Sequence, residues 1–178
     1  MTDRAPLPYD FHPEVPAFVV TSSDVAHGEQ MGNAQVYNSF GMSGDNISPE
    51  LSWTDFPPET RSFSVTAYDP DAPTGSGFWH WLVLDIPVSV TELPTGAGAA
   101  GGAGLPAGAF MVRNDYGSKD FGGAAPPQGD PAHRYVFAVH AVDSEKLGIN
   151  SGVSPAVAGF NLRYHTIARG LLVPVYGH

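Results

Sequence analysis

The sequence predicts a β-sandwich with one peripheral helix near its C-terminus. Its 178 residues include 21 Gly and 17 Pro, residue types that are unfavourable inside helices but common in the turns that join strands. Several short segments alternate apolar and polar residues, which is the period of a strand with one buried face. Only one late segment combines helical spacing with helical end signals. Many strands and one helix are typical of a sandwich, and the length and 42% hydrophobic content predict one domain over residues 1–178.

The first predicted element is a Pro-rich, extended arm over residues 1–16. From 61 to 68, apolar residues alternate with Ser and Thr, so we expect one face of this strand to lie in the core. Segment 134–143 is apolar on both faces and predicts a strand with a layer on each side. The full set of predicted strands is 17–20, 61–68, 79–86, 110–113, 134–143 and 171–176.

The single predicted helix spans residues 154–169. Ser154 suits the N-cap, Pro155 suits the first turn, and Gly170 supplies a stop signal. Apolar residues recur along it at helical spacing, and we expect this face to pack on the sheet. These residues are Val157, Phe160, Tyr164, Ile167 and Leu171.

The charge of the chain excludes some partners. The net charge is −10, from 8 basic and 18 acidic residues, so we expect no binding to nucleic acid and no stable attachment to an anionic membrane surface. There is no Cys, which excludes disulfides, thiolate metal sites and a cysteine nucleophile. No stretch approaches the roughly 18–20 apolar residues of a membrane span, and the start has no apolar run, so the expected location is the cytoplasm.

A glycine-rich run, residues 96–104, contains the pattern G-x-G-x-x-G. No amphipathic helix and no βαβ unit follow it, so a flexible surface loop is the better interpretation and no nucleotide cofactor is predicted. The sequence also lacks a G-x-S-x-G elbow, a Walker loop and an H-E-x-x-H motif. We therefore predict no cofactor and no metal.

Polar residues gather in three clusters at the ends of predicted strands. The first is Asp69-Pro-Asp71-Ala-Pro73, which is either a rigid pair of acids or a plain surface turn. In the second, His80 follows Trp79 and is either a ligand-binding group or a core histidine with satisfied hydrogen bonds. The third is Gly122–Pro127 followed by His133-Arg134-Tyr135, where small residues let backbone amides approach an anion. Arg134 could instead form a structural salt bridge with an acid of the first cluster.

These clusters, in this order and spacing, resemble the phosphatidylethanolamine-binding protein family in its bacterial and archaeal branch. Ile47–Trp53 and Asn114–Gly117 resemble further family segments, and the resemblance runs from about residue 16 to residue 176. It implies two antiparallel β-sheets in Greek-key order and a pocket for phosphate, phosphoethanolamine or carboxylate. The implied pocket residues are Asp69, His80, His133, Tyr135, Ala125, Pro126, Asp71 and Pro73. The resemblance implies that Arg134 and Trp79 support them. We expect Trp79 to make the rim of the pocket more apolar than in animal members.

The resemblance implies a ligand-binding protein that could modulate or inhibit a partner kinase or protease. We expect Asp69 to orient His80 or His133, and the imidazoles, the Tyr135 hydroxyl and amides near Ala125 to donate to the anion. Two alternatives remain open: a hydrolase or metal-dependent enzyme using Asp69, His80 and His133, and a scaffold with a vestigial pocket. A homodimer is a further expectation, because bacterial relatives are often dimers.

Overall fold

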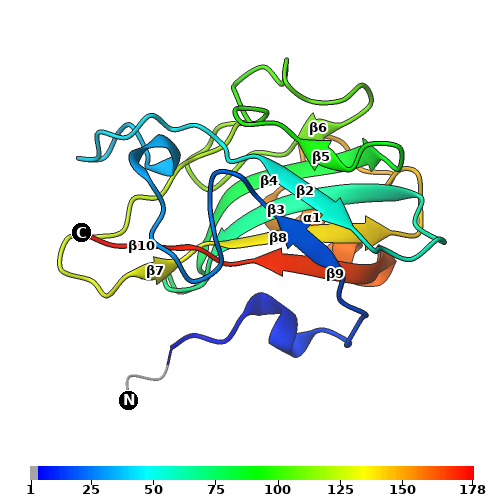
Figure 1. Cartoon of the computed structure of the whole chain (residues 1–178), viewed down its shortest axis with the longest axis horizontal. Coiled ribbons are helices and arrows are strands. Elements are labelled where there is room, and N and C mark those ends of the chain that lie inside the picture. The colour runs from blue at the N-terminus through cyan, green and yellow to red at the C-terminus, as the bar shows by residue number, and fades with distance from the viewer. Residues whose placement is uncertain (1–3) are drawn as a thin grey trace.

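A five-stranded antiparallel sheet forms the centre of the molecule (Figure 1). The computed structural model describes residues 4–178. The strands lie in the order β6-β4-β3-β8-β9, so β3 is central and every neighbouring pair is antiparallel. Their bounds are Ser62–Asp69 for β3, Phe78–Pro87 for β4, Phe110–Met111 for β6, Val136–Val142 for β8 and Thr166–Leu172 for β9.

A three-stranded sheet covers one face of this central sheet, and the mostly β, two-sheet fold predicted from the sequence is confirmed. Large side chains from both sheets meet in one core cluster, where Leu51 and Trp53 pack with Phe63, Trp81 and Phe137. The strand order is β1-β2-β5, with bounds Val19–Thr21, Leu51–Thr54 and Glu92–Leu93.

The helix α1, Pro155–His165, covers the opposite face of the central sheet. Its buried residues, Ala158 and Leu162, belong to a second core cluster with Leu82 and Leu84 of β4. Because of this second layer, β3 is buried on both faces, whereas its alternating sequence predicts one buried face. The predicted layers on each side of the 134–143 strand are confirmed, although the strand is broken at Tyr135 into β7, His133–Arg134, and β8.

The prediction for α1 is wrong at its C-terminal end. Ser154 caps the helix as expected by accepting a hydrogen bond from the Val157 amide, but the helix ends at His165, and β9 begins at Thr166. Thr166 is β-branched, and its hydroxyl bonds back to the Leu162 carbonyl at 2.6 Å, which satisfies one of the last carbonyls of the helix. The predicted sheet-facing residues Val157, Phe160 and Tyr164 are exposed instead.

The N-terminal arm is not extended throughout. Pro8–Phe11 forms a short 3-10 helix, and the Asp10 carboxylate accepts from the Leu7 amide at its start. The arm is joined to the sheet at its far end, where the Arg169 amide donates to the Pro16 carbonyl at 2.9 Å. Residues 1–3 of the predicted arm lie outside the described residues.

The remaining elements are one short strand, a second 3-10 helix and the glycine-rich loop. Strand β10, Val175–Tyr176, pairs with β7 and continues the antiparallel pairing of β9 with β8. A second 3-10 helix spans Asn33–Gln35. The glycine-rich run 96–104 forms consecutive turns, as a loop should, but part of it is buried: a Cβ on Gly98 would lie 2.7 Å from the Phe121 side chain.

Candidate functional site

A cavity of about 200 Å³ lies where β3 ends, β4 begins and β7 passes by. The structure brings together residues from all three sequence clusters around it. Six of the predicted site residues line the cavity: Asp69, Pro73, His80, Ala125, His133 and Tyr135.

A β-bulge aims His80 into this cavity. On β4, Trp79 pairs with Tyr68 and Trp81 pairs with Ala67, so His80 is the extra residue without a partner on β3. Such an extra residue changes the side-chain alternation. The bulge keeps His80 on the same face as Trp81, whereas Trp79 points to the opposite face, as the neighbour of His80 in a strand should. There Trp79 lines a different cavity, and it does not form the rim expected from the sequence. The ring of His80 lies 5.1 Å from that of Tyr135, centroid to centroid.

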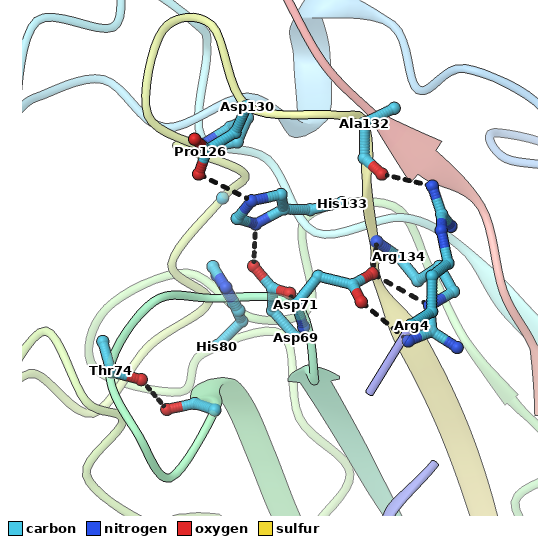
Figure 2. A network of polar contacts seen from close by, with 12 residues as sticks. Arg4, Asp69, Asp71, Thr74, His80, Pro126, Asp130, Ala132, His133 and Arg134 are labelled. Atoms are coloured by element: carbon cyan, nitrogen blue, oxygen red, sulfur yellow. Dashed lines mark hydrogen bonds and ion pairs between the residues drawn. The ribbon is translucent and has the colours of Figure 1, made fainter. Parts of the chain in front are cut away.

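His133 lies between two carboxylates (Figure 2). Its Nδ1 is 2.7 Å from Asp69 Oδ2, and both side chains are buried. Its Nε2 is 3.4 Å from Oδ2 of Asp130, which is partly exposed. The hydrogen bond to Asp69 raises the pKa of His133, although burial opposes it, and Asp130 adds to the increase. At neutral pH this favours an imidazolium whose two N–H groups face acids.

Asp69 orients His133 and not His80. One of its oxygens is used by His133, and the other accepts from the Asp71 amide at 2.8 Å. His80 instead holds the Gly122 carbonyl through Nδ1 at 2.7 Å, so this nitrogen carries the proton. Burial lowers the pKa of His80, which keeps the ring neutral and leaves Nε2 as an acceptor.

The Tyr135 hydroxyl is a buried donor whose proton has no acceptor among the residues that the structure describes. Tyr135 is only 2% exposed, and no hydrogen bond of normal geometry reaches its oxygen from any residue in 4–178. Burial raises the pKa of Tyr135, and the nearby Asp69 charge raises it further, so the hydroxyl keeps its proton. Buried polar groups are nearly always hydrogen-bonded, so this hydroxyl is available for a bound molecule.

The glycine-rich wall has another role than the one expected. The amides of Phe121, Gly122, Gly123 and Ala124 all donate to the protein itself, and of these Gly123 donates to Asn46 Oδ1. Side chains larger than hydrogen would not fit here: a Cβ on Gly122 would lie 2.3 Å from the Tyr116 ring, and one on Gly123 would lie 2.5 Å from the Gln35 carbonyl oxygen. The glycines thus serve close packing of the chain on itself.

Asp71 and Arg134 form an ion pair beside the cavity and do not line it. The guanidinium donates through Nε and Nη2 to both Asp71 oxygens at 2.8 and 2.7 Å, and the Arg134 amide donates to Asp71 as well. Although burial opposes it, these contacts lower the pKa of Asp71. The salt bridge that the sequence offered as an alternative role for Arg134 is present, and it fixes the backbone next to His133.

Several residues that line the cavity were not predicted from the sequence. Phe78 and Tyr116 form an aromatic wall, with their rings 4.7 Å apart and edge to face. Tyr116 belongs to the Asn114–Gly117 segment, whose resemblance to the family was the available signal. Pro126 does not line the cavity, and its carbonyl oxygen faces His178 Nε2 at 3.0 Å. The other cavity residues without a predicted role are Ala72, Thr74 and Pro127.

Two features are absent from the described part of the chain. Within residues 4–178, no group of three or more His, Asp or Glu side chains is arranged to hold a metal ion. No helix in the same range is long and apolar enough to cross a membrane.

Comparison with known proteins gives consistent matches. The family model for phosphatidylethanolamine-binding protein matches residues 21–177. The UPF0098 protein YbcL of Escherichia coli K12 is 48% identical over 166 residues, 93% of this chain and 91% of the relative. The protein YbhB of the same organism is 44% identical over 155 residues, 87% and 97% of the two chains. The crystal structure of YbcL, described as a new member of the mammalian PEBP family, superimposes with a TM-score of 0.89 over 90% of this chain and 98% of that one.

Proposed function

Because the chain belongs to the phosphatidylethanolamine-binding protein family, we propose that it binds one small anion, such as phosphate, phosphoethanolamine or a carboxylate, in the cavity at Asp69, His80, His133 and Tyr135. The observation that carries this proposal is the buried Tyr135 hydroxyl, which lines the cavity and whose proton finds no acceptor within residues 4–178. The cavity volume of about 200 Å³ equals about seven waters at roughly 30 Å³ each. This is the size of a phosphoethanolamine group.

Two donors converge on the anion. The first is the Tyr135 O–H, and the second is the His133 Nε2–H, which faces Asp130 across 3.4 Å. The bound anion takes the place of the Asp130 carboxylate, which lies on a partly exposed turn and can move away. The hydrogen bonds are charge-assisted, because the anion meets an imidazolium that Asp69 keeps protonated.

His80 selects among anions. Its free nitrogen accepts a hydrogen bond and does not donate one, because Nδ1–H is bound to Gly122. A ligand that presents a donor beside its negative charge satisfies this nitrogen and should bind more tightly than a fully deprotonated anion such as sulfate, which binds through the other contacts alone. Singly protonated phosphate and the ammonium group of phosphoethanolamine both meet this requirement. From the sequence we expected both imidazoles to donate hydrogen bonds to the anion. The neutral state of His80 makes it an acceptor instead.

Calorimetric titration of phosphoethanolamine tests this arrangement. Tyr135→Phe removes one donor to a charged group and should weaken binding by about tenfold or more. Asp130→Asn removes the competing carboxylate and should tighten binding about two- to fivefold, as expected for a partly exposed ion pair. Asp143→Asn is the matched control, because Asp143 also pairs with a histidine, His165 at 2.8 Å, but lies outside the cavity. Unchanged affinity in both cavity variants would remove the basis of the proposal.

The wider roles rest on the same site. Inhibition of a partner kinase or protease, homodimer formation and a cytoplasmic location are expectations from the sequence, which pull-down, light scattering and cell fractionation would test. Cleavage of a phosphate ester by the protein would favour the alternative of a hydrolase.

A further inference from the structure

A second cavity, of about 260 Å³, lies on the face of the central sheet that the first cavity does not share. Its floor is the sheet, through Thr66, Trp79 and His140. Its walls are the 3-10 helix of the N-terminal arm and the helix α1. None of its lining residues lines the first cavity.

A chain of hydrogen bonds fixes the polar groups of the floor. Thr166 donates its only hydroxyl proton to the Leu162 carbonyl at 2.6 Å, so it must accept from His140 Nδ1–H at 3.3 Å. His140 Nε2 then has no proton and accepts from the Thr66 hydroxyl, which in turn accepts from the Tyr9 hydroxyl, each at 3.3 Å. These groups are satisfied within the protein, and His140 is neutral, in agreement with its pKa, which burial lowers well below the usual value.

Arg169 is different, because its guanidinium has no anionic partner. It lies over the Tyr9 ring, with Cζ 4.1 Å from the ring centroid. Its Nε is buried without an acceptor, and no carboxylate within residues 4–178 forms a salt bridge with it. Burial lowers the pKa of Arg169, whereas the hydrogen bonds that Arg134 donates to Asp71 raise the pKa of Arg134. Arg134 is a paired arginine, whereas Arg169 is a partly buried, unpaired cation facing a cavity.

The surroundings of Arg169 add positive charge and no negative charge. Arg163 of α1 also lines the cavity, and His12 lines it from the arm with a buried Nδ1 that lacks a partner among the described residues. Burial, followed by the charges of Arg169 and Arg163, lowers the pKa of His12. Of the acidic residues in 4–178, none lines this cavity, although the chain carries 18 acidic residues. Leaving a buried charge unpaired is unfavourable, so an anion from outside would stabilise this region.

We propose that this cavity is a second ligand site, which binds a small aromatic monocarboxylate with its carboxylate on Arg169 and its ring against Trp79 and Phe160. Apart from the cationic groups, the lining is mostly apolar and includes Pro8, Pro155 and Leu162. The volume of about 260 Å³ equals roughly nine waters, close to the ten non-hydrogen atoms, by count, of phenylacetate. The planar fork of a guanidinium matches a carboxylate, and an apolar wall disfavours a dianion such as phosphate because it cannot replace its hydration.

Calorimetric titration with phenylacetate, next to the neutral analogue phenylacetamide, tests the site. We expect saturable one-to-one binding of phenylacetate at millimolar concentration and binding of the amide that is about tenfold weaker or more. An excess of inorganic phosphate should not displace phenylacetate. Amide NMR shifts should change mainly in residues 8–12 and 155–163.

Two variants locate the binding. Arg169→Gln should weaken phenylacetate binding about tenfold or more, and Arg61→Gln, an equal charge change at an exposed position outside the cavity, should not. Because Arg169 also contacts the arm, Gly159→Leu provides a variant that keeps it. A Cβ on Gly159 meets nothing within 4 Å, and replacing a mid-helix Gly favours folding, so this protein should be folded at least as stably while the added side chain blocks the cavity.

The proposal is overturned by any of three results: no binding of phenylacetate, equal binding of acid and amide, or full binding by the folded Gly159→Leu protein. Loss of phosphoethanolamine binding at the first cavity would not contradict the proposal of a second site, because no lining residue is common to the two cavities.

Discussion

Three histidines of this chain differ in charge because their neighbours differ. His133 has a buried carboxylate on Nδ1, and its pKa is raised. His80 and His140 are bonded to a carbonyl or to hydroxyls, and burial lowers the pKa of both. The chemistry of each cavity follows from this difference, because the first cavity has a charged imidazole and the second has a neutral one.

Asp69→Asn should lower the pKa of His133 toward or below the ordinary value of about 6.5, because the bond to Asp69 is the largest cause of the increase. NMR titration of the imidazole C–H signals measures it directly. Asp130→Asn should produce a smaller decrease, since Asp130 is a lesser cause. The interpretation of the pair is wrong if the order of the two effects is reversed.

The same charge state makes anion affinity depend on pH at the alkaline end. With the pKa of His133 raised, binding of sulfate, whose charge is constant in this range, should hold at about pH 6.5 and decline as the pH rises through the raised pKa. Calorimetry across this range checks the sign. Sulfate affinity that increases with pH contradicts it.

His140→Gln should change how stability depends on acid. His140 is neutral when folded, with a lowered pKa, so unfolding takes up a proton below the unfolded pKa of about 6.5. This histidine thus removes stability at up to about 1.4 kcal/mol per pH unit as the pH falls below that value. Urea unfolding at several pH values should show a shallower acid slope for the variant, whereas His27→Gln, at an exposed position, should match the wild type.

At the residue scale, the sequence predicted which residues lie together but not which side of the sheet each side chain points to. Asp69, His80, His133 and Tyr135 do surround one cavity, which followed from their order in a known family. Trp79 was misplaced because adjacent side chains of a strand point to opposite faces. A bulge at His80 decides which of the two faces the cavity, and a bulge depends on strand pairing that local sequence does not contain. Asp130 was missed because an acid in a Gly- and Pro-rich turn is usually a surface group.

At the element scale, the signals at the N-terminal end of the helix were reliable, whereas those inside it and at its C-terminal end were not. The Ser154 cap and the Pro155 start are correct, since they act within one turn. The stop at Gly170 failed because residues 166–172 pair with β8, and pairing across the sheet overrides a weak helical preference. The exposed Phe160 and Tyr164, each 63% exposed, show that helical spacing alone does not identify the buried face.

Ser154→Ala should lower the free energy of unfolding by about 1 kcal/mol. The Ser154 hydroxyl accepts from the Val157 amide, and the variant leaves that donor without its cap. Thermal or urea unfolding measures the change. Ser89→Ala, at an exposed serine for which no side-chain hydrogen bond was found, should change stability by less than about 0.5 kcal/mol. Equal effects of the two substitutions would contradict a capping role.

At the scale of the whole molecule, the net charge of −10 governs encounters with surfaces. We expect no measurable binding to vesicles rich in anionic lipid, because a chain of this charge is repelled as a whole even though its cavities accept single anions. Vesicle co-sedimentation at low and physiological salt is the measurement, with neutral vesicles as the control. Tight, salt-sensitive sedimentation with anionic vesicles would falsify this view of the surface.

The first residues of β4 connect the two faces of the sheet directly. Trp79 and His80 are joined by one peptide unit, yet they belong to cavities on opposite sides. If occupancy of one cavity rotates that peptide unit, the other is affected without any relay of side chains. Thermodynamic linkage then requires the effect to be mutual: phenylacetate must change the affinity for phosphoethanolamine by the same factor as the reverse. If neither ligand changes the affinity for the other, this peptide unit is too rigid to couple the two faces.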